Sequence, residues 1–216
     1  MTYVKYDLSN EKVCYLIQTD EMLGELIRYI KTCELAIEED GYKCLVKYIV
    51  GQQISDKARE TIWQRFYVTF GNVTPEILLA ANISEFRKIG LSRNKVDYIK
   101  NLAACIVEKK INFEQLSMLS NKKIITELTS LRGIGEWTAE MYLIFSLGRN
   151  DVFAKGDATI RRAIQWMYNL KELPSLKVLT GYFNNWIKYA TIASLFLWKA
   201  TTLGLIKEPF SKIIQK

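Results

Sequence analysis

No histidine occurs among the 216 residues of the sequence. This absence excludes an imidazole general base, a Ser-His-Asp triad and a histidine metal ligand, so carboxylates must carry out any acid–base chemistry. No apolar run approaches the roughly 20 residues of a membrane-spanning helix, and the charged amino-terminal residues are followed by no secretory apolar core. We therefore expect an intracellular protein, in the cytoplasm, nucleoid or nucleus, without membrane contact.

Cysteine is scarce and dispersed. The four cysteines lie far apart, without a C-x-x-C pair, at positions 14, 33, 44 and 105. This spacing suits neither a zinc site nor the four-cysteine arrangement of an iron–sulfur cluster. We expect reduced, mostly buried thiols and no iron–sulfur cluster.

The charge balance is basic. Thirty lysines and arginines against 23 aspartates and glutamates give a formal net charge of +7. This charge is compatible with a polyanionic partner, although many basic proteins bind no nucleic acid. About half of the residues are apolar and a quarter are charged, which is typical of a soluble globular chain.

The three prolines leave long segments in which apolar residues recur at helical spacing. Thr74-Pro75-Glu76 is a helix start, with a capping threonine before proline at the first helical position. No stretch shows the alternation or the hairpin turns of an antiparallel sheet. We predict an all-α fold of about ten helices with short connections. The expected helices include residues 19–35, 56–70, 93–109, 120–130, 136–147 and 181–202, with two more that begin at Pro75 and Asp157.

The segment Leu131–Ala139 carries two glycines one residue apart, between two amphipathic helices. We expect Gly133 and Gly135 to form a tight turn with φ values that other residues resist. The first amides of the second helix would then point outward and bind a phosphate without reading sequence. Leu131 and Ile134 would pin the two helices together. From the glycines alone, a plain helix–turn–helix corner is the alternative.

Further motifs accompany this turn in a family-specific order. Asp151–Arg162 contains an Asp-Val-Phe…Gly-Asp run, and upstream lie Ile49–Ser55 and Ile89–Lys95. With the hairpin and its Trp-Thr-Ala exit, these motifs make the chain resemble the helix-hairpin-helix DNA glycosylase superfamily, in its 3-methyladenine DNA glycosylase II branch. The resemblance covers roughly residues 40 to 200.

The resemblance implies two helical lobes with a DNA-binding cleft between them. We expect a central lobe at residues 41–149, which ends in the helix-hairpin-helix at about 121–147. Residues 1–40 and 150–216 would form a second lobe that carries the catalytic aspartate. The expected partner is double-stranded DNA containing damaged bases, and the expected oligomeric state is a monomer.

The resemblance places the catalytic aspartate at Asp157. Aspartate is also favoured as a helix N-cap, so capping of the helix Ala158–Tyr168 is the alternative. The two roles are compatible, because amide hydrogen bonds and the helix dipole favour an ionised carboxylate. Such a charge stabilises the oxocarbenium character that the sugar develops when a glycosidic bond breaks.

The resemblance also implies the substrate, an alkylated purine such as 3-methyladenine or 7-methylguanine that is flipped out of the duplex. These bases are cationic and leave with little or no general acid, which suits a chain without histidine. An electron-rich ring would favour them, and Trp137 is placed to supply one, although tryptophan is more often a core residue. Strand-cutting relatives have a Schiff-base lysine here, so Trp137 implies a monofunctional glycosylase without a lyase step.

The resemblance implies roles for three further sets of residues. Gln53 should fill the gap left by the extruded nucleotide, with Ser55 near the minor groove; alternatively, Gln52 and Gln53 cap a buried turn. Contacts with the DNA backbone are expected at the hairpin residues Arg132, Gly133, Gly135 and Thr138. Relatives hold a structural monovalent or similar cation on the main-chain carbonyls that correspond to Thr129, Leu131 and Ile134. The resemblance also implies that catalysis requires no cofactor.

The chain departs from the family pattern at two places. Arg132 replaces the usual hairpin proline and adds a charge near the expected phosphate. Trp186 is not followed by proline and arginine, so its role in a pocket stays open, and Lys155 is either a phosphate contact or a solvated lysine.

Two rival functions remain. One is a monofunctional glycosylase for uracil, hypoxanthine or a mismatched base. The other is a non-catalytic DNA-binding protein that uses the hairpin alone.

Overall fold

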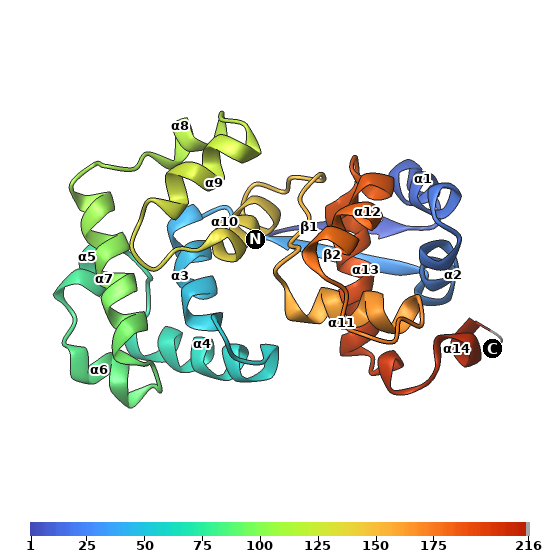
Figure 1. The fold of residues 1–216 in the computed structure, drawn as a ribbon. Helices are drawn as coiled ribbons and strands as arrows, with labels where there is room; N and C mark the ends of the chain where they lie inside the picture. Colours follow the sequence, from blue (N-terminus) through green and yellow to red (C-terminus); the bar gives the residue numbers. More distant parts are fainter. Residues whose placement is uncertain (215–216) are drawn as a thin grey trace. The chain divides into compact units, whose positions relative to one another are not determined.

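The computed structural model describes residues 1–214, which form two compact units. One unit is Glu38–Leu147, and the other joins Met1–Ile37 to the chain from Gly148 onward. The boundaries expected from the sequence lay after residues 40 and 149. Helices dominate both units (Figure 1), which confirms the predicted helical fold class. A role for the two units as the walls of a DNA-binding cleft stays a prediction.

The unit Glu38–Leu147 is built from helices alone in the described chain. The clustered rings of Phe66, Phe70 and Phe86 form part of its core, and α10 packs against α3 and α9. Short polar side chains begin most of these helices by accepting a hydrogen bond from a first-turn amide, as Ser92 does from Lys95 N. The helices are α3 (Gly41–Gly51), α4 (Asp56–Phe70), α5 (Pro75–Ala80), α6 (Ile83–Lys88), α7 (Arg93–Val107), α8 (Phe113–Ser117), α9 (Asn121–Thr129) and α10 (Glu136–Phe145).

The other unit packs helices around one pair of strands. The strands are antiparallel, with Thr2 opposite Ile37 and Asp7 opposite Thr32. The central helix α13 contacts β2, α2 and α11 (Figure 1). The elements are β1 (Thr2–Asp7), α1 (Glu11–Thr19), α2 (Glu21–Ile30), β2 (Thr32–Ile37), α11 (Ala158–Met167), α12 (Leu176–Trp186), α13 (Ala190–Thr202), the short 3-10 helix η1 (Leu205–Lys207) and α14 (Phe210–Ile214).

The strand pair corrects the expectation that no antiparallel sheet occurs. The predicted helix 19–35 ends at Ile30, because Lys31 has a left-handed φ of +67°. Cys33 and Leu35 then lie in β2 and are buried. Two helices connect the strands, so no short hairpin turn marks this sheet in the sequence.

The predicted helix 181–202 is also corrected, because it is two helices, α12 and α13. Tyr189 N donates a hydrogen bond to Trp186 O at 2.7 Å, and the Tyr189 ring meets the Tyr15 ring edge-on at 5.3 Å. Thr191 N donates to Asn150 O at 2.9 Å. These tertiary contacts separate the helices without glycine or proline.

Candidate DNA-binding and catalytic site

The hairpin between α9 and α10 is a tight turn. Ile134 N donates to Leu131 O at 3.1 Å, and Gly133 between them has a φ of +92°. A Cβ atom at Gly133 would lie 2.0 Å from Cγ of Tyr98 on α7. Both the backbone conformation and the contact with Tyr98 therefore require glycine at this position.

Gly135 has a different role from the one expected. Its φ of −93° and ψ of 174° are ordinary extended values, so the expectation of an unusual φ is wrong for this glycine. Gly135 is the N-cap of α10 and offers no side chain to the first-turn amides. A Cβ atom placed on Gly135 would meet nothing within 4 Å. The amino end of α10 is thus open enough for an anion to approach.

The other hairpin residues differ in accessibility. Arg132 is exposed, Leu131 is half-buried and Ile134 is buried. Thr138 is only 1% exposed, and its Oγ1 accepts a hydrogen bond from Gln52 Nε2 at 3.0 Å. Its side chain therefore faces the interior, and only its main chain remains a candidate DNA contact.

Asp157 is the half-buried N-cap of α11. Its Oδ1 accepts hydrogen bonds from Thr159 N and Ile160 N, both at 2.9 Å. A third donor is Nε1 of Trp198 on α13, at 3.2 Å. Three N–H groups thus orient the carboxylate. Sequence reasoning missed Trp198, because it lies 41 residues from Asp157 and no local motif links the two.

Comparison with known proteins identifies the family. Residues 46–188, well over half of the chain, match the model of the HhH-GPD superfamily of base excision DNA repair proteins. The chain belongs to this superfamily.

The chain is also similar to named proteins in sequence and in structure. DNA-3-methyladenine glycosylase 1 of Schizosaccharomyces pombe is 31% identical over 80% of this chain and 77% of its own length. A crystal structure of DNA-3-methyladenine glycosidase from Bacillus halodurans superposes with a TM-score of 0.82, at 30% identity and full coverage of both chains. The S. pombe 3-methyladenine DNA glycosylase in complex with abasic DNA gives 0.84, at 29% identity, over 89% of this chain and 97% of that one.

The HhH-GPD motif Ile49–Ser55 forms the turn between α3 and α4. Gln52 has φ −56° and ψ 131°, Gln53 has φ +56°, and Ile54 N donates to Gly51 O at 3.4 Å, as in a type II turn. Gln53 is exposed. Its left-handed φ is uncommon for a residue other than glycine, and such backbone strain is often found at functional sites.

The neighbours of Gln53 have structural roles. Ser55 Oγ accepts a hydrogen bond from Ala58 N at 3.3 Å as the N-cap of α4, so its predicted minor-groove contact would come in addition to capping. Gln52 ties the turn to the hairpin, because its Nε2 also donates to Gly133 O at 2.9 Å. The alternative that glutamine secures a turn therefore applies to Gln52 and not to the exposed Gln53.

The second HhH-GPD motif, Ile89–Lys95, supports the same turn from α7. Gly90 has a φ of +102°, and Ser92 caps α7. Lys95 Nζ donates to Val50 O in the last turn of α3 at 2.7 Å, and burial lowers the pKa of Lys95. The lysine thereby satisfies a carbonyl at the negative end of the α3 dipole.

Trp137 belongs to an aromatic group. It is half-buried and meets the buried Tyr48 edge-on, with ring centroids 5.9 Å apart. Tyr48 also stacks on Phe145 at 5.3 Å and lies 5.4 Å from the guanidinium carbon of Arg59. Trp137 therefore packs against Tyr48 and also keeps accessible surface. Trp186, by contrast, is fully buried, and its Nε1 donates to Asp20, so it is a core residue.

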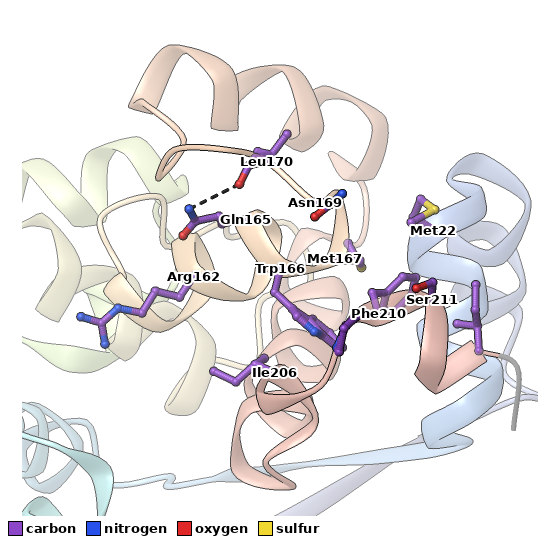
Figure 2. Close-up of a pocket in the computed structure, with 12 residues that line it drawn as sticks. Met22, Arg162, Gln165, Trp166, Met167, Asn169, Leu170, Ile206, Phe210 and Ser211 are labelled. Carbon is purple, nitrogen blue, oxygen red and sulfur yellow. Dashed lines mark hydrogen bonds between the residues drawn. The ribbon is translucent and has the colours of Figure 1, made fainter.

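A cavity of about 570 Å³ lies elsewhere, among α2, α11, η1 and α14 (Figure 2). Trp166 and Phe210 meet edge-on within it at 5.0 Å, and Gln165 Nε2 donates to Leu170 O. None of the residues predicted for the site lines this cavity. Across residues 1–214, no three acidic, cysteine or histidine side chains form a candidate metal site, and no helix in that range is long and apolar enough to cross a membrane.

Proposed function

We propose that the protein is a monofunctional DNA glycosylase of base excision repair, which removes alkylated purines of the 3-methyladenine and 7-methylguanine type from double-stranded DNA. The carrying observation is the carboxylate of Asp157, held by three N–H donors at the amino end of α11 in a chain of the HhH-GPD superfamily. The names of its relatives support the alkylpurine substrate and the 3-methyladenine glycosylase branch.

In the proposed reaction, the carboxylate of Asp157 stabilises the positive charge that develops on the deoxyribose as the N-glycosidic bond breaks. A water molecule adds to C1′ and gives a proton to the carboxylate, which passes it to solvent. The bonding electrons leave with the base, so a cationic alkylpurine departs as a neutral molecule. No general acid is needed, in keeping with a sequence that has no histidine.

The remaining residues bind and present the nucleotide in this proposal. The open amino end of α10, at Gly133 and Gly135, holds a phosphate through main-chain amides, with Arg132 adjacent. Gln53, with Ser55 beside it, takes the place of the extruded nucleotide. Trp137 offers a ring surface to the cationic base. Tryptophan has no amine for a Schiff base, so borohydride should trap no covalent complex with DNA.

A monovalent cation is proposed on the main-chain carbonyls of Thr129, Leu131 and Ile134. Helix α9 ends at Thr129, so its last carbonyls lie at the negative end of the helix dipole. Leu131 O accepts one hydrogen bond, from Ile134 N, and keeps a second lone pair. These oxygens fit a hard cation, which would add positive charge beside the phosphate. Duplex affinity that is the same in potassium and in choline salts at equal ionic strength would contradict this site.

A panel of duplexes, each with one defined lesion, tests the substrate class. We expect release of 7-methylguanine and 3-methyladenine. Release of uracil, hypoxanthine or a mismatched base without any alkylpurine would overturn the substrate assignment, and binding without release of any base would indicate a DNA-binding module.

Asp157→Asn tests the catalytic role. We expect single-turnover excision to fall by about 10²–10⁴-fold while duplex affinity is kept. Asp7→Asn is the matched control, because Asp7 lies in the same unit and its carboxylate accepts a hydrogen bond from Ser9 N. Excision at the unsubstituted rate in Asp157→Asn would show that this carboxylate is not catalytic.

A further inference from the structure

The side chain of Gln52 links two parts of the proposed DNA-binding surface. Its amide nitrogen uses both N–H bonds, one toward Gly133 O at 2.9 Å and one toward Thr138 Oγ1 at 3.0 Å. Both acceptors belong to the hairpin and the first turn of α10. Gln52 itself is the first central residue of the turn that contains Gln53.

This turn needs external support. The exposed Gln53 adopts a left-handed φ of +56°, a conformation that side-chain-bearing residues keep only when their surroundings enforce it. Within the turn, the Ile54 N to Gly51 O hydrogen bond is long, at 3.4 Å. Lys95 holds the preceding residue, Val50, from α7, and Gln52 holds the turn to the hairpin.

We infer that Gln52 is a positioning residue that couples phosphate binding by the hairpin to the extrusion of the nucleotide. Gln52 fixes the turn to the hairpin and the first turn of α10, the segment proposed to bind the DNA phosphate. Gln53 therefore has a fixed position relative to the bound DNA backbone. This inference rests on the proposed glycosylase function. Extrusion is costly for a paired base. If Gln53 is already held in position, no loop has to become ordered at that step, which lowers the entropic cost.

Gln52→Met tests the coupling, because methionine has a similar length but no N–H donor. Single-turnover excision of 7-methylguanine is measured in two duplexes, one with the lesion opposite cytosine and one with it opposite an abasic site. We expect about a tenfold loss opposite cytosine, equivalent to about 1.4 kcal/mol, and less than about a threefold loss opposite the abasic site. Extrusion is already easy in that second duplex.

Gln64→Met is the matched control, because the Gln64 amide also makes a side-chain hydrogen bond, to Glu60 on the exposed face of α4. It should change neither rate. In a Gln53→Ala background, Gln52→Met should have little further effect, since both act on one step.

Equal losses of Gln52→Met on the two duplexes, or independent effects with Gln53→Ala, would overturn the coupling. A thermal melt of each variant distinguishes a folding defect from a positioning defect. If the unsubstituted protein released no alkylpurine at all, the proposed function would fail instead, and that result is read from the unsubstituted protein alone.

Discussion

At the scale of single residues, the Asp157 carboxylate depends on a partner from a distant part of the chain. Two of its three donors are main-chain amides of its own helix, which any N-cap aspartate could obtain. The third, Trp198 Nε1, approaches from α13 and fixes the orientation of the carboxylate about its Cα–Cβ bond. Capping alone does not require this indole. A substitution of Trp198 therefore tests whether Asp157 only caps the helix or is also oriented for catalysis.

Trp198→Phe should therefore slow excision without unfolding the protein. Phenylalanine keeps most of the ring packing but lacks the N–H donor, and one hydrogen bond to a charged group contributes about 1.5–3 kcal/mol. We expect the single-turnover rate to fall by roughly tenfold, with duplex affinity nearly unchanged and a melting temperature lower by only a few degrees. Trp166→Phe serves as a control, because its indole instead donates to Glu208 O. Equal rates for Trp198→Phe and the unsubstituted protein would contradict the positioning role.

The two hairpin glycines should respond differently to alanine. Gly133→Ala places a methyl group against Tyr98 and forces a positive φ on alanine, so we expect a loss of at least about 2 kcal/mol in the free energy of unfolding. Gly135→Ala meets no neighbour and should cost at most about 1 kcal/mol, the usual penalty of alanine at an N-cap. Urea denaturation of both variants measures this contrast. Similar losses of stability for the two variants would contradict the difference between Gly133, with its positive φ and its contact with Tyr98, and Gly135.

At the scale of elements, a buried carboxylate joins three helices of one unit. Asp20, 9% exposed, caps α2 through Leu23 N and accepts hydrogen bonds from the Tyr168 hydroxyl at the end of α11 and from Trp186 Nε1 on α12. Burial raises the pKa of Tyr168, and its hydrogen bond to the negative Asp20 raises this pKa further. The folded state thus favours the neutral hydroxyl.

This arrangement predicts a loss of stability at alkaline pH. Because the pKa of Tyr168 is raised in the folded state, its contribution is complete below the ordinary tyrosine value of 10.0 and is lost as the pH rises above it. The free energy of unfolding should fall by up to about 1.4 kcal/mol per pH unit for this group. Tyr168→Phe should make the decline shallower, although the buried Tyr42 also has a raised pKa and still contributes. Urea titrations between pH 8 and pH 11 should reveal the difference; identical slopes would contradict it.

Local sequence signals predicted the helices whose ends have local causes. Thr74 and Pro75 marked α5, and Asp157 marked α11, because capping and proline geometry act within one turn. The strand pair and the break between α12 and α13 could not be predicted in this way. The break depends on Tyr15 and Asn150, which lie far away in the chain, and the strand pair joins segments as distant as Thr2 and Ile37.

The candidate site shows the same difference between features with local sequence signals and features that depend on distant residues. The motifs identified Asp157, the hairpin and the Gln53 turn, since each is a compact segment with its own sequence pattern. Trp198 and the tie made by Gln52 arise from contacts that span 41 and 81 residues or more. No periodicity or spacing carries such information, and this is also why Thr138 was expected to face DNA.

At the scale of the whole molecule, the net charge of +7 should produce a salt-dependent attraction to DNA. A protein that neutralises several phosphates releases counterions, so its affinity falls steeply as salt rises. Most of this attraction is independent of sequence and lesion. In the proposed function, recognition of the damaged base then comes from extrusion and from the site around Asp157, after the backbone has been bound.

Arg132→Gln separates the local contribution of the hairpin from the global charge. Arg132 is exposed at the tip of the turn, and loss of one phosphate contact should lower the slope of log affinity against log salt by about 0.9. The loss in affinity should be equal for damaged and undamaged duplexes, because a phosphate contact carries no base information. Arg28→Gln removes the same formal charge, but Arg28 lies on α2 in the other unit and pairs with Glu25 at 2.6 Å, so its salt slope should stay unchanged. If fluorescence anisotropy titrations between 50 and 200 mM salt gave the same slope for both variants, net charge rather than the hairpin would account for the grip on DNA.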